Sequence, residues 1–75
     1  MNLHEECLGA VFWTKGGEYR ARLELYIPSL NAFECVLFGP DGESIKTVRY
    51  QPNGHPINLN YQNVASLILT TPPIH

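Results

Sequence analysis

The sequence has few cysteines, no long apolar run and no basic stretch at its start. Cys7 and Cys35 are the only two cysteines in 75 residues, so one bridge is the most they allow, which excludes a disulfide-rich secreted scaffold. No apolar stretch approaches the roughly 20 residues that a membrane helix needs. No apolar run follows a basic patch at the amino terminus, as it would in a secretory leader. We therefore expect a cytoplasmic protein with no membrane contact.

An excess of positive charge is also missing. Seven acidic residues outnumber five basic ones, which gives a net charge of −2, and both kinds are scattered along the chain. A protein that binds nucleic acid mainly through phosphates usually carries a basic excess. Composition therefore weakens a nucleic-acid-binding role unless the fold brings basic residues together.

The chain does contain a series of short β-type segments, separated by glycine, proline, asparagine and aspartate. This pattern is typical of an antiparallel meander or a small barrel. We predict one all-β domain over residues 1–75, with a polar lead-in at 1–7 that holds at most a helical turn, and an extended tail at 72–75. The predicted strands are 8–14, 18–27, 33–38, 43–51, a short one at 57–60, and 64–71, with a tight turn at 61–63. We expect five or six strands in all, depending on whether the short segment 57–60 forms one, arranged as a small antiparallel five-stranded meander or barrel.

The clearest strand is 18–27, where apolar and polar residues alternate. A period of two places one set of side chains on the core and the other toward solvent, whereas a helix would scatter both sets. Pro28 ends or bends this strand because proline has no backbone N–H for the ladder. The predicted core set is Tyr19, Ala21, Leu23, Leu25 and Ile27, and the predicted solvent set is Arg20, Arg22, Glu24 and Tyr26.

Taken in order, these segments resemble the Sm and Sm-like family of small β-barrels. That family's first motif is a strand, a glycine-containing turn, a long bent strand, a loop carrying Asn, and an apolar strand. Residues 11–14, 15–17, 19–27, 29–31 and 33–37 occupy those places. Its second motif, a short strand, a tight turn and a closing strand, is similar to residues 57–68, with Asn63-Val64 where the family often has Asn and an aliphatic residue. The resemblance implies a small barrel, and related SH3-type barrels share this strand order.

The same resemblance implies RNA contacts through Asn31 and Asn60, with Tyr61 beside the latter. Two departures weaken that expectation. Pro28 and Ser29 stand where the family's RNA-contacting loop usually has Asp before its Asn. The Arg-Gly of the second motif is replaced by Asn60-Tyr61, so a cation that the family uses on RNA is absent.

Metal binding and catalysis have little support. His4 and Cys7 have a spacing that zinc sites use, and Cys35 and His55 are candidates to complete a tetrahedral set, but neither Cys-x-x-Cys nor His-x-x-x-His occurs. Cys35 lies in an apolar segment and is expected to be a small buried hydrophobe, and a Cys7–Cys35 disulfide is the remaining alternative. We expect no metal and no cofactor.

Serine residues and carboxylates also lack a catalytic setting. Ser29, Ser44 and Ser66 have no motif around them, and nucleophilic catalysis requires a nucleophile, a base and a pocket that holds both. The acidic residues that lie close together in sequence fall at the amino terminus, as Glu5 and Glu6 do, or in a turn, as Asp41 and Glu43 do. We therefore expect neither an enzyme nor a small-molecule substrate.

Nucleic-acid binding remains an alternative through aromatic and basic side chains, since bases stack on aromatic rings while cations follow the phosphates. The competing interpretation is that arginine and tyrosine on a solvated strand pack against cross-strand neighbours, often with a glutamate partner. Glu24 supports that second interpretation. The aromatic candidates are Trp13, Tyr19, Tyr26, Tyr50 and Tyr61, with Lys15, Arg20 and Arg22 as the basic ones.

A protein partner or a homo-oligomer is the leading expectation. The segments 33–38 and 64–69 are apolar on both faces, although only one face of a sheet meets a core, so some apolar side chains are expected to face outward. Exposed apolar patches on small proteins usually mark interfaces, and self-association would also offset a small core. The predicted partner-binding residues are Arg20, Arg22, Tyr26, Val36, Phe38 and Leu67, and the chain is expected to be a non-catalytic binding module.

Overall fold

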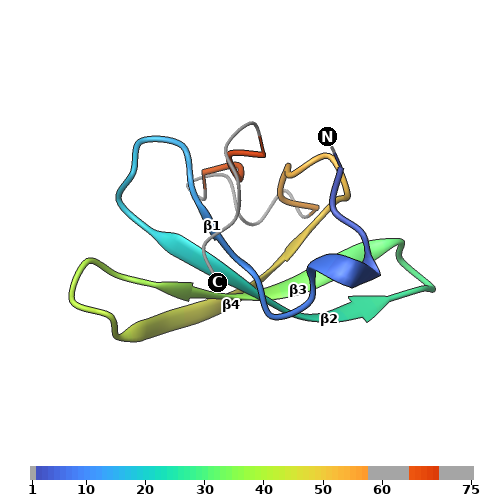
Figure 1. The fold of residues 1–75 in the computed structure, drawn as a ribbon, viewed down its shortest axis with the longest axis horizontal. Helices are drawn as coiled ribbons and strands as arrows, with labels where there is room; N and C mark the ends of the chain where they lie inside the picture. The colour runs from blue at the N-terminus through green and yellow to red at the C-terminus, as the bar shows by residue number, and fades with distance from the viewer. Residues whose placement is uncertain (1, 58–64, 70–75) are drawn as a thin grey trace.

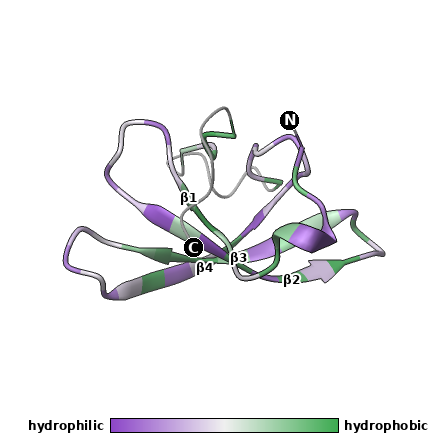
Figure 2. Cartoon of the chain, viewed as in Figure 1, coloured by the Kyte–Doolittle hydropathy of each residue, from purple (hydrophilic) through white to green (hydrophobic). Residues whose placement is uncertain are grey.

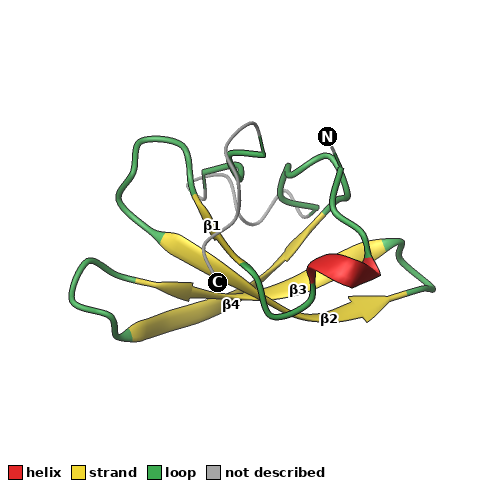
Figure 3. Ribbon diagram, in the orientation of Figure 1, coloured by secondary structure: helices red, strands yellow, loops and turns green. Residues whose placement is uncertain are grey.

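The computed structural model describes residues 2–57 and 65–69, which contain a four-stranded antiparallel sheet (Figure 1). A single 3-10 turn is the helical structure in this part of the chain (Figure 3). The sheet is an open meander in which each strand pairs with the next. The elements are η1 (Glu5–Cys7), β1 (Val11–Trp13), β2 (Arg20–Ile27), β3 (Ala32–Phe38) and β4 (Ser44–Tyr50).

The prediction of an all-β fold is confirmed, and the first four predicted strands overlap β1 to β4. The strand expected at 57–60, the turn at 61–63 and the tail at 72–75 lie, apart from residue 57, outside the described residues. Of the last predicted strand, residues 65–69 are described, and they contain one isolated bridge, between Leu67 and Thr14. No helix in the described ranges is long and apolar enough to cross a bilayer.

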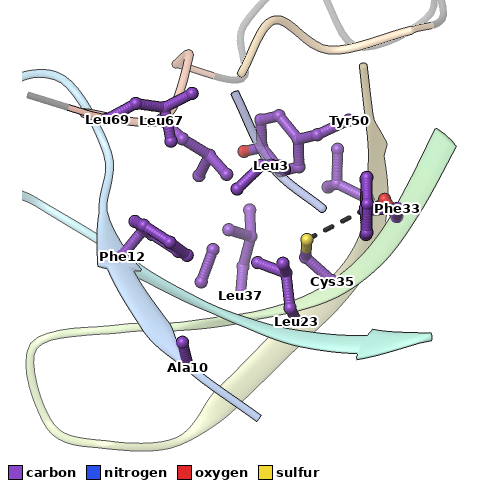
Figure 4. Packing of buried hydrophobic residues seen from close by; sticks show 12 residues of the cluster. Leu3, Ala10, Phe12, Leu23, Phe33, Cys35, Leu37, Tyr50, Leu67 and Leu69 are labelled. Atoms are coloured by element: carbon purple, nitrogen blue, oxygen red, sulfur yellow. Dashed lines mark hydrogen bonds between the residues drawn. The ribbon is translucent and has the colours of Figure 1, made fainter. Parts of the chain in front are cut away.

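One face of the sheet, which we call the inner face, carries the core. Side chains from neighbouring strands meet there in cross-strand rows because residues paired in register project to the same side. Figure 4 shows side chains of this core packed together, and Figure 2 shows the hydropathy of the residues along each strand. The rows are Phe12–Ala21–Leu37, Leu23–Cys35–Val48 and Tyr26–Phe33–Tyr50.

A β-bulge in β2 reverses the facing of its second half. Leu23 pairs with Cys35 and Leu25 pairs with Glu34, so Glu24 is an extra residue on this strand. Because a bulge opposes two residues to one, every side chain after it changes face. The predicted alternation therefore holds for the buried residues Ala21 and Leu23 and is wrong at Leu25, which is 42% exposed, and at Tyr26, which packs against the core.

The inner face is covered by segments from both ends of the chain and by the loop after β4. The backbone N–H of Leu3 donates to the carbonyl of Pro52 at 2.7 Å, and that of Leu67 donates to the carbonyl of Gly54 at 2.8 Å. Leu3, Leu67 and Leu69 are buried in the core cluster. In Figure 1 these segments lie on one side of the sheet. The predicted polar lead-in thus contributes one side chain, Leu3, to the core.

Candidate binding face of the sheet

The opposite side of the sheet, which we call the outer face, gathers aromatic, aliphatic and charged side chains. They follow from the same register, since residues between the core positions project away from the core. Trp13 is 40% exposed, and Val36 and Phe38 are half-buried. The outer rows are Trp13–Arg20–Phe38–Ser44, Val11–Arg22–Val36–Thr47 and Leu25–Glu34–Arg49.

Two arginines of β2 lie over aromatic rings on this face. The guanidinium carbon of Arg20 is 5.8 Å from the centroid of the Trp13 ring, and that of Arg22 is 5.0 Å from the centroid of Phe38. A guanidinium above a ring within about 6 Å is attracted by the ring quadrupole. Cations and rings therefore alternate across three neighbouring strands, which holds the long arginine side chains against the sheet.

Ion pairs neutralise part of this face. Arg22 Nε donates to Glu24 Oε2 at 2.8 Å, and Arg49 Nε donates to Glu34 Oε1 at 3.4 Å. These side chains are substantially exposed, so each pair contributes little to stability. The bulge that displaces Glu24 leaves its carboxylate beside Arg22.

The structure brings together Arg20, Arg22, Val36 and Phe38 among the six predicted partner-binding residues. The outward facing expected for Leu67 is wrong, because this side chain is 4% exposed within the core cluster. The facing expected for Tyr26 is also wrong. Beyond the bulge its ring packs against Phe33 at 4.9 Å between centroids, on the inner face.

The residues considered for RNA are divided between the described and undescribed parts of the chain. Asn60 and Tyr61 lie outside the described residues. Asn31 ends the β2–β3 turn in a left-handed conformation, with φ of 47°, and its Oδ1 accepts a hydrogen bond from the Tyr26 hydroxyl at 2.9 Å. Asparagine tolerates this region because its short side chain bonds locally. Tyr50, one of the proposed stacking platforms, is buried and offers no ring to a ligand.

Both cysteines are free thiols, and they lie in different environments. Cys7 is partly buried beside the core, and Cys35 is fully buried. Burial, with a smaller contribution from Glu24 and Glu34, raises the pKa of the Cys35 thiol to about 12. Among residues 2–57 and 65–69, no three His, Cys, Asp or Glu side chains gather as a metal site would require.

The buried thiol predicts a loss of stability at alkaline pH. Unfolding returns Cys35 to its ordinary pKa of 9.0, so above that pH the unfolded chain loses a proton that the folded chain keeps until about 12. The free energy of unfolding should fall by about 1.4 kcal/mol per pH unit in this window. Burial also raises the pKa of Tyr50 above its ordinary 10.0, which steepens the loss at higher pH. Urea unfolding from about pH 8 to about pH 11 measures the slope.

The control for this alkaline effect is Cys35→Ala. This variant is less stable near neutral pH because it leaves a small cavity. Across the same pH window, its free energy of unfolding should fall less steeply than that of the parent protein. The difference between the two slopes should correspond to about one proton. An unchanged slope in Cys35→Ala would show that other groups cause the loss.

Sequence reasoning missed a pairing of His55 with Ser66. His55 Nδ1 lies 2.9 Å from Ser66 Oγ, and it connects the loop after β4 to the 65–69 segment. No sequence motif signals this contact, because 11 residues separate the pair and the fold alone brings them together. All seven acidic side chains lie in the described ranges, and none of them forms an ion pair with His55. Among the described residues, His55 is therefore not paired with a carboxylate of the kind that orients the base in a Ser-His-Asp triad.

An open hollow lies beside the β3–β4 turn, next to the outer face. The turn itself is tight, with the N–H of Gly42 donating to the carbonyl of Gly39, and Asp41 Oδ1 accepts from the N–H of Glu43 at 3.1 Å. The hollow is shallow. Of its two acidic side chains, Asp41 is hydrogen-bonded within the turn and Glu43 is exposed. Its lining residues are Tyr19, Gly39, Pro40, Asp41, Glu43, Ser44 and Ile45.

The outer face is thus the described surface on which the aromatic rings of Trp13 and Phe38 and the guanidinium groups of β2 lie together. Comparison with protein-family models, curated proteins and solved structures gave no match to this chain.

Proposed function

We propose that this chain is a non-catalytic protein-interaction module, and that its outer face binds either a larger protein or a second copy of the chain. The observation that carries the proposal is the exposed row in which Trp13, Arg20 and Phe38 stand side by side on β1, β2 and β3. Tryptophan, phenylalanine and arginine are enriched at the cores of protein interfaces, and tryptophan and arginine are also enriched among the residues that contribute most to binding.

Contacts within the outer face support the proposal. The Trp13 ring lies under the Arg20 guanidinium and the Phe38 ring under that of Arg22, so less conformational entropy is lost when a partner covers these side chains. Trp13 remains 40% exposed and Leu25 remains 42% exposed despite these contacts. Covering such apolar area would stabilise a complex by roughly 25 cal/mol per Å² before the costs of association.

The proposal includes closure of the domain as a five-stranded Sm-like or SH3-type barrel. Its support is the hydrogen bonding along β1, where the N–H of Ile68 donates to the carbonyl of Trp13 and the N–H of Lys15 donates to the carbonyl of Ser66, each at 2.8 Å. These two bonds flank the bridge between Thr14 and Leu67. A fifth strand alongside β1 would protect that edge from unwanted pairing and leave the outer face as the accessible surface.

RNA binding is the alternative function. It is favoured by the half-exposed indole of Trp13 beside Arg20, a combination on which a base can stack. It is opposed by the net charge of −2 and by the ion pairs that occupy Arg22 and Arg49. For this reason we place the protein partner first.

Selection of binders from a displayed random-peptide library tests the proposed face. Binders selected against the intact protein should lose about tenfold or more in affinity for Trp13→Ala and for Phe38→Ala, because aromatic anchors dominate such interfaces. Leu30→Ala is the matched control, since Leu30 is equally exposed at 45% but lies in the β2–β3 turn. Thermal melts of each variant show whether the fold is retained.

The opposite result would contradict the proposal. If the selected peptides bind Trp13→Ala and Phe38→Ala as tightly as the parent protein, the outer face is not the interaction site. If single-stranded oligouridylate binds this face with a steep salt dependence while peptides do not, the RNA alternative replaces the proposal.

A further inference from the structure

We propose that Arg20 receives a carboxylate from the protein partner, so that the partner presents an aspartate or glutamate flanked by apolar side chains. This inference rests on the proposed function of the outer face and adds the chemistry of the partner. It assigns to Arg20 the role of a specificity-determining residue.

The first argument concerns the partners of the acidic side chains. All seven acidic side chains of the chain belong to the described residues, and the ion pairs they form are Arg22–Glu24 and Arg49–Glu34. Arg20 therefore has no carboxylate side chain of its own chain within ion-pair distance. Its guanidinium carries a fork of N–H donors that matches a carboxylate in two parallel bonds.

The second argument is the position of this cation. Arg20 is paired in register with Trp13 on one side and Phe38 on the other, and it is half-buried between them. The stacked indole orients the guanidinium, and the neighbouring rings offer apolar contact on both sides. A partner that covers the rings removes water from the cation, which strengthens its attraction to a carboxylate and penalises a partner without one.

The third argument concerns the number of charges. A nucleic-acid strand requires a series of cations along its backbone, whereas, within the described part of the chain, the outer face holds one arginine without a carboxylate partner. The two lysines lie elsewhere, Lys15 in the β1–β2 turn and Lys46 opposite Leu37, a residue of the inner face. Glu24 and Glu34 further oppose a polyanion. One unneutralised cation between apolar groups matches one acidic side chain with apolar neighbours.

Nuclear magnetic resonance with synthetic peptides tests the inference directly. The probe is the peptide Ac-Gly-Leu-Asp-Phe-Gly-amide, titrated into the ¹⁵N-labelled intact protein, and the comparison peptide has Asn in place of Asp. Trp13 is the single tryptophan, so its indole N–H resonance is identified without further assignment. We expect the Asp peptide to shift the Trp13 indole and the Arg20 Nε–H resonances, and to bind about fivefold more tightly than the Asn peptide.

Arg20→Gln and Arg49→Gln form a matched pair of variants on the outer face. Arg20→Gln should abolish the preference for the Asp peptide over the Asn peptide, because it removes the cation but retains the rings. Arg49→Gln should leave the preference within twofold of the parent value, since Glu34 already neutralises this cation. Both substitutions lie on exposed or half-buried strand positions, and a thermal melt verifies the fold of each.

The possible failures are distinguishable. If both peptides shift the Trp13 indole equally, or if Arg20→Gln keeps the preference for Asp, the inference about Arg20 is wrong while the outer face remains the binding surface. If neither peptide shifts this resonance and library-selected binders ignore Trp13→Ala, both proposals fail. A shift produced by oligouridylate alone, or a self-association that persists unchanged in Arg20→Gln, would likewise overturn the acidic partner.

Discussion

Replacing Tyr50 by alanine should lower the free energy of unfolding by about 3–5 kcal/mol, the range observed for deletion of large buried aromatic side chains. Tyr50 is fully buried, and it stands in the same inner row as Phe33 and Tyr26. A chain of this length has a total stability of only about 4–11 kcal/mol. Urea unfolding followed by far-ultraviolet circular dichroism measures the loss, and a small domain of this kind is expected to unfold in one step.

The Tyr50→Phe variant separates the ring from its hydroxyl. The Tyr50 hydroxyl donates to the carbonyl of Ala65 at 3.0 Å, so phenylalanine retains the packing and leaves that carbonyl without this partner. We expect a loss of about 1 kcal/mol, the usual net value of such a hydrogen bond. Hydrogen exchange should accelerate most at the backbone N–H groups of Ile68 and Lys15, which bond across the 65–69 segment and β1.

An equal loss in Tyr50→Phe and Tyr50→Ala would contradict this account. It would mean that the hydroxyl, and not the ring, carries most of the contribution of Tyr50. Uniform acceleration of exchange throughout the sheet in Tyr50→Phe would mean that the 65–69 segment does not open separately from β1 to β4.

The sequence was sufficient to predict the strands whose signals are local. Three local signals each determine the backbone conformation within a few residues, and the structure agrees with all of them. They are the alternation over Ala21 and Leu23, the proline after Ile27, and the glycines at the hairpin turns. The bulge at Glu24 was not predictable, because it arises from how β2 pairs with β3. A period-two pattern is the same with or without an extra residue on one strand, and only the register shows which face each side chain takes.

The residues of the outer face were predicted only in part, again because the bulge in β2 could not be read from the sequence. Arg20 and Arg22 precede the bulge, so the local alternation places them correctly, whereas Tyr26 follows it and changes side. Leu67 was misjudged because its burial depends on Leu3 and the loop after β4, which approach it only in the folded chain. The stacking of Arg20 on Trp13 and the absence of a carboxylate partner are likewise properties of the register and not of the local sequence.

Replacing Gly54 by alanine should be the most damaging single-methyl change, with an expected loss of about 2–4 kcal/mol. Gly54 has φ of +90°, a conformation that costs an L-residue about 1–2 kcal/mol. An added Cβ would also lie 3.3 Å from the carbonyl oxygen of Leu67 and 3.2 Å from Leu69 Cδ1. That contact would push away the segment whose Leu67 N–H bonds to the carbonyl of Gly54, and the added strain is about 1–2 kcal/mol.

Gly16→Ala is the matched control, because Gly16 has nearly the same φ, +92°, but an added Cβ there would meet nothing within 4 Å. It should lose only the conformational cost of about 1–2 kcal/mol. The difference between the two variants in urea unfolding therefore isolates the contact between the loop after β4 and the 65–69 segment. If the two glycines are equally sensitive, that contact contributes nothing measurable. If Gly54→Ala is the costlier by about 1–2 kcal/mol and exposes the N–H of Leu67 to exchange, close packing of this loop keeps the 65–69 segment in place over the inner face.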